Sequence, residues 1–118
     1  MGFGLATFVG GSLTPGFELF AKQAKLARHL AGCDLVVTGE GALDESTLMG
    51  KGAGQVAVLC RAHGIPVIGL AGVVKETKKL GKLFAETHGL TDRTSPEQAR
   101  RRAGLWLAQL AEEVAANQ

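Results

Sequence analysis

The residues best suited to chemistry lie in one stretch, residues 39–54, which reads Gly-Glu-Gly-Ala-Leu-Asp-Glu-Ser-Thr-Leu-Met-Gly-Lys-Gly-Ala-Gly. Carboxylates, hydroxyl side chains and a single lysine are gathered here among glycines. The lysine, Lys51, comes just before a predicted helix, and the free amides at a helix N-terminus favour an anion such as phosphate. The residue types therefore indicate an anion-binding site with acidic partners.

Two common nucleotide-binding motifs do not fit this stretch. A Walker A loop needs glycine five residues before its Gly-Lys pair and Ser or Thr after the lysine, but Glu45 and Gly52 occupy those positions. Its glycines also lack the spacing of a dinucleotide-binding turn. An ordinary loop with turn glycines therefore stays open as an alternative to an anion site.

The stretch is expected to follow a strand and to precede a helix. Residues 34–38 favour a strand and lack polar alternation, which is typical of a strand covered on both faces of a parallel sheet. Residues 39–52 are predicted as a loop, residues 53–63 as a helix, and residues 65–71 as a second buried strand. Because ligands bind beyond the carboxyl ends of strands in open α/β sheets, the loop is the expected place for a site.

Helices are predicted for most of the remaining chain. The apolar spacing predicts one over residues 2–10, a second from Thr14-Pro15 to residue 31, and a third over residues 76–87. A last helix is expected to open at the capping box Ser95-Pro96-Glu97-Gln98, and its apolar stripe, which includes Trp106, is more typical of core than of a ligand site. The pattern also allows a short strand near residues 90–94.

Strand and helix alternation predicts an α/β fold with a small parallel sheet of two or three strands flanked by helices. The 118 residues suit a single domain, residues 1–118. An average sheet has about 5–6 strands. The chain is therefore expected to be part of a larger three-layer α/β/α domain, or to complete its sheet by self-association.

Composition excludes several classes of protein. With 46% hydrophobic and 20% charged residues the chain should fold. A formal charge of +2 is too small to indicate binding to nucleic acid or to an anionic membrane. No stretch approaches the roughly 20 apolar residues that span a bilayer, and no signal peptide is visible. These features predict a cytoplasmic location.

The same residues resemble the signature loop of the bacterial glycerate kinases. The likeness rests on Gly39-Glu40-Gly41, Asp44, Thr47-Leu48 and Gly50-Lys51 after the Asp-Leu-Val-Val-Thr run. It continues through Val56-Ala57 and residues 63–72, and includes the helix start Leu13-Thr14-Pro15-Gly16. Residues 2–72 match well and the C-terminal third matches loosely. The chain departs from the usual family pattern at Ser46, where the family mostly has Gln.

The resemblance implies an enzyme that transfers the terminal phosphate of ATP, with Mg²⁺, to a hydroxyl of D-glycerate. Lys51 would bind phosphate or the substrate carboxylate, and Asp44 would hold Mg²⁺ or accept the hydroxyl proton. Glu40 would take either role of Asp44 or would orient Lys51. The residues expected around phosphate and substrate are Gly39, Gly41, Ser46, Thr47, Gly50 and Gly52.

Family members are longer, with two α/β domains, and this chain resembles only their C-terminal portion. The 118 residues alone are therefore expected to be inactive, and to need either a homo-oligomer or an N-terminal domain supplied by other residues. Two further interpretations stay open. The chain could be a truncated α/β module without catalysis, or a small protein that binds an anion or a nucleotide through the same loop.

Overall fold

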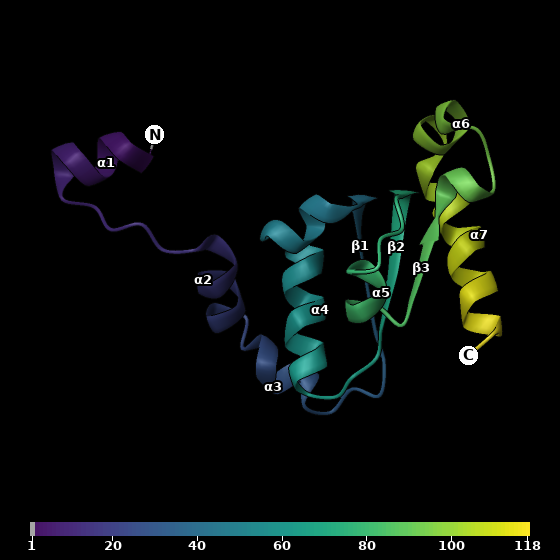
Figure 1. The fold of residues 1–118 in the computed structure, drawn as a ribbon, viewed down its shortest axis with the longest axis horizontal. Coiled ribbons are helices and arrows are strands. Elements are labelled where there is room, and N and C mark those ends of the chain that lie inside the picture. Colours follow the sequence, from purple (N-terminus) through teal and green to yellow (C-terminus); the bar gives the residue numbers. More distant parts are fainter. Residues whose placement is uncertain (1) are drawn as a thin grey trace.

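The computed structural model describes residues 2–118 and contains a three-stranded parallel sheet with helices on both sides (Figure 1). The strands are β1 (Val36–Leu43), β2 (Val67–Val74) and β3 (Glu86–Gly89), in the order β1-β2-β3. Strand β1 pairs with β2 from Val36 opposite Val67 to Leu43 opposite Val74. The predicted α/β class and small parallel sheet are confirmed.

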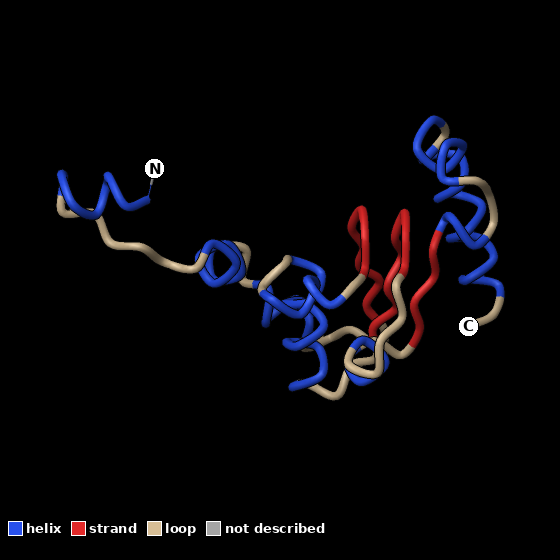
Figure 2. Tube along the Cα trace, turned by 45° about the horizontal axis from the view of Figure 1, so that its top comes forward, coloured by secondary structure: helices blue, strands red, loops and turns tan. Residues whose placement is uncertain are grey.

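Helices α4 and α5 lie on one side of the sheet, and α6 and α7 lie on the other (Figure 1). Helix α1 and the segment after it extend away from the sheet as an arm (Figure 2), and Phe3 and Phe8 on this arm are 80% and 83% exposed. The α-helices of residues 2–118 are α1 (Gly2–Val9), α2 (Gly16–Gln23), α3 (Leu26–Leu30), α4 (Gly52–Ala62), α5 (Leu80–Leu83), α6 (Pro96–Arg101) and α7 (Ala103–Ala116), and the 3-10 turns are η1 (Glu45–Met49) and η2 (Leu90–Asp92).

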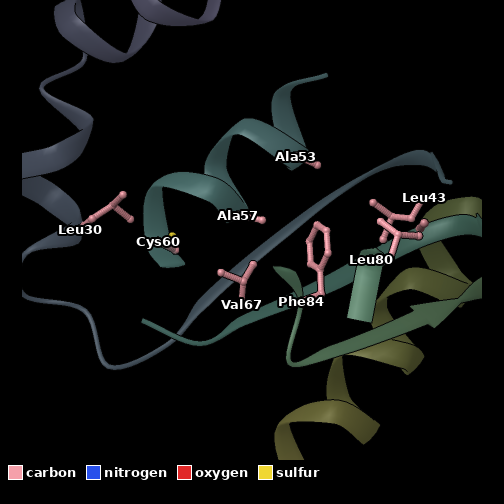
Figure 3. Close-up of a cluster of buried hydrophobic side chains, with 9 residues drawn as sticks. Leu30, Leu43, Ala53, Ala57, Cys60, Val67, Leu80 and Phe84 are labelled. Carbon is pink, nitrogen blue, oxygen red and sulfur yellow. The ribbon is translucent and has the colours of Figure 1, made fainter. Parts of the chain in front are cut away.

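Two apolar clusters hold these layers together. The first joins α3, α4 and α5 to the sheet, with Ala57, Cys60 and Val67 at its centre (Figure 3). The second lies on the opposite face, where α6 and α7 pack Ala99, Leu110 and Val114 against β2. No residue of β1 belongs to the buried part of the second cluster in the described chain. Strand β1 is therefore covered by a helix on one face only.

Strand β1 differs from the prediction in length and in burial. It extends through residues 39–43, which were predicted as loop, because their backbone continues the ladder to β2. Its side chains alternate between half-buried and exposed up to Ala42, so the expectation of a strand buried on both faces is wrong. The reason is tertiary, since α4 covers one face and α7 packs beside β2.

The helix predicted from Thr14 to residue 31 is interrupted. Pro15 rather than Thr14 precedes its first residue, and no side chain caps it. Lys25 has a left-handed backbone, with φ of 50°, and this conformation separates α2 from α3. The amides of Ala24 and Lys25 bond back to Phe20 and Lys22, which closes the end of α2.

The helix predicted over residues 76–87 is also wrong over most of its length. Only Leu80–Leu83 is helical, and Phe84 turns to an extended backbone so that Glu86–Gly89 can pair with β2. The third strand is therefore Glu86–Gly89, and the short strand predicted near residues 90–94 is wrong, because Leu90–Asp92 forms the turn η2. By contrast, the helix predicted over residues 53–63 and the strand predicted at 65–71 are confirmed, within a few residues, as α4 and β2.

The start of the last helix is confirmed. The Ser95 hydroxyl accepts a hydrogen bond from the Gln98 amide at 3.3 Å, and Pro96 is the first helical residue. The helix itself is broken at Arg102, whose non-helical backbone separates α6 from α7.

Candidate functional site

The candidate site lies where β1 ends and α4 begins. Glu40 lies within β1, and Asp44 follows the last residue of that strand. The chain then forms the short turn η1, passes Gly50 with φ of 106°, and enters α4 after Lys51. The turn between strand and helix brings Lys51 back beside the two carboxylates that precede it.

Asp44 is fixed by a reciprocal cap. Its Oδ1 accepts hydrogen bonds from the amide of Ser46 at 2.8 Å and from the Ser46 hydroxyl, while its own amide donates to Thr47 Oγ1 at 3.1 Å. The bonds from Ser46, chiefly that from its hydroxyl, hold the pKa of the Asp44 carboxyl below its ordinary value, and the charges of Lys51 and Lys75 act in the same direction. Asp44 is therefore a carboxylate at neutral pH, held in one orientation.

Thr47 anchors this turn to the helix. It is fully buried, and it lies against α4 at Gly54. A Cβ at Gly54 would come within 2.0 Å of the Thr47 carbonyl oxygen, so only glycine allows this approach. The close contact fixes the Asp44 turn relative to the first turn of α4, and thus relative to Lys51.

Lys51 lies between two carboxylates. Its Nζ is 4.0 Å from Glu40 Oε2 and 3.9 Å from Asp44 Oδ1, and its side chain is 41% exposed. The other oxygen of Glu40, Oε1, is buried and has no hydrogen-bond partner. Long ion pairs of this kind at a partly exposed site contribute little stability. The arrangement instead leaves the ammonium group accessible beside the N-terminus of an eleven-residue helix, where free amides favour anions.

The glycines predicted around the ligand differ in the structural reason why glycine occupies each position. A Cβ at Gly39 would come within 2.3 Å of the Leu70 carbonyl oxygen, so the approach of β1 to β2 requires glycine there. Gly50 has a positive φ and ends η1. A Cβ at Gly41 or Gly52 would meet nothing within 4 Å. Packing therefore accounts for Gly39 and backbone conformation for Gly50, whereas Gly41 and Gly52 leave backbone accessible beside the site.

Lys75 is a site residue that sequence reasoning missed. Its amide donates to the carbonyl oxygen of Leu43, the residue before Asp44, at 2.8 Å, and its charge lowers the pKa of Asp44. The signal in the sequence was weak, because Lys75 is one of several lysines that follow a predicted strand. The parallel register, which aligns Leu43 with Val74, brings it to the site.

The acidic side chains of the candidate site bear on whether it can hold a metal ion. Among residues 2–118, no group of three or more His, Cys, Asp and Glu side chains is arranged to hold a metal ion. Glu40 and Asp44 supply two carboxylates, and Mg²⁺ is usually held by one or two carboxylates together with water and substrate phosphates. The residues present thus fit Mg²⁺ bound together with a phosphate ligand.

In the described chain, no helix has the length and apolar character needed to cross a membrane.

Comparison with known proteins points to one family. The sequence profile of the glycerate kinase family matches residues 1–118. Glycerate 2-kinase of Escherichia coli K12 is 39% identical over 72 residues, which are 61% of this chain and 19% of that protein. A glycerate kinase of Bacillus cereus is 38% identical over 74 residues, which are 63% of this chain and 19% of that protein.

A solved structure shares the fold. The protein, provisionally assigned as glycerate kinase 2 of Salmonella typhimurium LT2, superposes with a TM-score of 0.55 and 34% identity over 75% of this chain and 21% of its own. The chain thus spans about a fifth of the length of these relatives.

Proposed function

This chain belongs to the glycerate kinase family, and from that premise we propose that residues 39–52 contribute to the transfer of the terminal phosphate of ATP to a hydroxyl of D-glycerate. ATP and D-glycerate are the ligands that this function requires. Since ATP is the phosphate donor, we place the protein in the cytoplasm.

The position of Lys51 carries this proposal. Its ammonium group lies at the carboxyl end of β1, beside the N-terminus of α4 and within about 4 Å of two carboxylates. Phosphoryl transfer depends on positioning and on the neutralisation of phosphate charge rather than on covalent chemistry by the protein. A lysine at a helix N-terminus, with accessible backbone at Gly52, suits an anionic phosphate or carboxylate.

The two carboxylates are suited to different roles. Asp44 has a lowered pKa and is held by Ser46, so it is a weak proton acceptor and a good cation ligand. Asp44 would hold Mg²⁺, which when bound neutralises charge on the phosphates. Glu40 has a buried oxygen without a partner and an oxygen near Lys51, which suits orienting that lysine or accepting the hydroxyl proton.

Replacement of Lys51 tests the proposal. Lys51→Ala should weaken binding of ATP or D-glycerate by about 1.5–3 kcal/mol, the range for hydrogen bonds to charged groups, and this corresponds to roughly 10- to 150-fold in affinity. The measurement is calorimetric titration of each ligand in the presence of Mg²⁺. Lys22→Ala is the matched control, because Lys22 is an exposed lysine on α2, outside the site.

Turnover is best measured in a hybrid enzyme. In the hybrid enzyme, the 118-residue chain replaces the corresponding segment of the E. coli glycerate 2-kinase. The remainder of that kinase supplies the other elements of the fold. There Lys51→Ala should lower the rate sharply and Lys22→Ala should leave it unchanged, since a fixed charge matters most in the transition state. Equal binding and equal turnover for both variants would show that Lys51 is a solvated loop residue and would remove the basis of the proposal.

A further inference from the structure

A second lysine, Lys75, lies beside Asp44 at the edge of the sheet where β1 and β2 both end (Figure 1). The last paired residues of the two strands are Leu43 and Val74, so the residues that follow them, Asp44 and Lys75, leave the sheet at neighbouring positions. The amide of Lys75 donates to the Leu43 carbonyl oxygen at 2.8 Å. This bond belongs to the backbone, so it holds Lys75 at this position whatever its side chain does.

The two lysines near Asp44 differ in how their charge is compensated. Lys51 Nζ lies 4.0 Å from Glu40 Oε2 and 3.9 Å from Asp44 Oδ1. Lys75 is exposed, and among residues 2–118 no carboxylate lies within 4.0 Å of its ammonium group. Its charge nevertheless reaches the site, because it helps to lower the pKa of the Asp44 carboxyl. Lys75 therefore brings to the site a cation that the acids of the described chain leave free for a ligand.

The charge balance of the site favours such a second cation. Lys51 with Glu40 and Asp44 has one more negative than positive charge, and an ammonium group between two carboxylates has much of its field cancelled. Phosphoryl transfer from ATP to D-glycerate brings two anions together and depends on neutralising their charge. Lys75 offsets the excess negative charge, whereas its neighbour Glu76 lines a separate hollow beside α5 and β3.

We propose that Lys75 binds an oxyanion of the ligands, so that Lys51 and Lys75 each serve one of the two anions. The oxyanion is the carboxylate of D-glycerate or a phosphate of ATP, since a lysine ammonium group binds either as a compact point charge. The inference rests on the proposed function, because it requires both ligands to bind at this edge of the sheet. It adds a binding residue from β2 and the loop after it, outside residues 39–52.

Steady-state kinetics of the hybrid enzyme test this role. Lys75→Ala removes the ammonium group and keeps the amide that bonds to Leu43, so the melting temperature should be unchanged. The KM for D-glycerate or for ATP should rise at least about tenfold, the lower end of the range for a hydrogen bond to a charged group. A rise for D-glycerate identifies the carboxylate as the bound group, and a rise for ATP identifies a phosphate. Lys75→Arg should keep most of the affinity, because it retains the charge.

Lys78→Ala is the matched control. Lys78 is an exposed lysine three positions further along the same loop, and the charges that act on Asp44 are those of Lys51 and Lys75. Its replacement removes the same charge from the protein and should leave both KM values unchanged. Unchanged KM values in Lys75→Ala, or equal changes in Lys75→Ala and Lys78→Ala, would overturn the proposal.

Comparison with the Lys51→Ala hybrid separates this inference from the proposed function. An effect of Lys51→Ala with none of Lys75→Ala would keep the proposed function and refute the role of Lys75. An effect of Lys75→Ala with none of Lys51→Ala would remove the basis of the proposed function and keep Lys75 as an anion-binding residue. If the hybrid does not turn over, calorimetric titration with ATP and with D-glycerate gives the same comparison as Kd values, and a hybrid that binds neither ligand contradicts both.

Discussion

The contact between Gly54 and Thr47 gives the sharpest test of how the site is held. Replacing Gly54 by alanine places a methyl group 2.0 Å from the Thr47 carbonyl oxygen and 2.9 Å from its carbonyl carbon. Ordinary contacts of this kind begin at 3.4 Å, so α4 and η1 must separate by about 1.4 Å. Both groups belong to backbone, and neither can move aside by a simple side-chain rotation.

The change in stability expected for Gly54→Ala is the balance of two opposing effects. Overpacking a tightly packed site costs about 1–3 kcal/mol, and a contact between backbone atoms lies at the upper end of that range. Alanine is better than glycine inside a helix by about 1 kcal/mol, which offsets part of the loss. The net expectation for Gly54→Ala is a loss of about 2 kcal/mol, or roughly 6–12 °C in melting temperature for a domain of this size.

Gly52→Ala provides the matched control. Gly52 lies in the same helical turn, and a Cβ there meets nothing within 4 Å. Its replacement should leave stability unchanged or raise it by up to about 1 kcal/mol. The assay is thermal unfolding followed by circular dichroism, with urea unfolding to obtain free energies. Equal stability of the two variants would show that the close approach of η1 to α4 does not hold the site, and the reasoning would fail.

Four further outcomes are expected. Thr47→Val keeps the shape but removes the hydroxyl that accepts from the Asp44 amide, so urea unfolding should show a loss of about 1–2 kcal/mol that Thr47→Ser largely restores. Asp44 has a lower pKa in the folded protein than in the unfolded chain, so its ionisation stabilises the folded protein above the ordinary pKa near 4. This contribution is lost as the pH falls through the pKa of Asp44 in the folded protein. Ser46→Ala should therefore be less stable than the parent above about pH 5, and unfolding curves from pH 7 to 3 should show the difference closing. Lys51→Ala should change the free energy of unfolding by less than about 0.5 kcal/mol, because its ion pairs are long and partly exposed. The 118 residues alone should give negligible glycerate-dependent ADP production in a coupled assay, and a turnover near the ~10 per second typical of enzymes would contradict this expectation.

Local patterns in the sequence determined the class of the fold and the place of the candidate site. The apolar spacing of residues 53–63 identified α4, and Ser95-Pro96 identified the start of α6, because both signals depend on neighbours within a few residues. The change from a β-favouring run to carboxylates, glycines and Lys51 placed the candidate site after a strand, although that strand ends at Leu43 and not at Thr38. For these features the chemistry of adjacent residues was sufficient.

Pairing between distant segments decided the rest. Residues 39–43 became strand because β2 lies beside them, and the helix predicted over residues 76–87 shortened because Glu86–Gly89 pairs with β2. The register of β1 and β2 brought Lys75 next to Asp44, although 31 positions separate them in the chain. Local propensities differ by a kilocalorie or less per residue, so a ladder of backbone hydrogen bonds and a shared apolar core override them. The exposed face of β1 was equally invisible in the sequence, because burial of a strand depends on which helices pack against it.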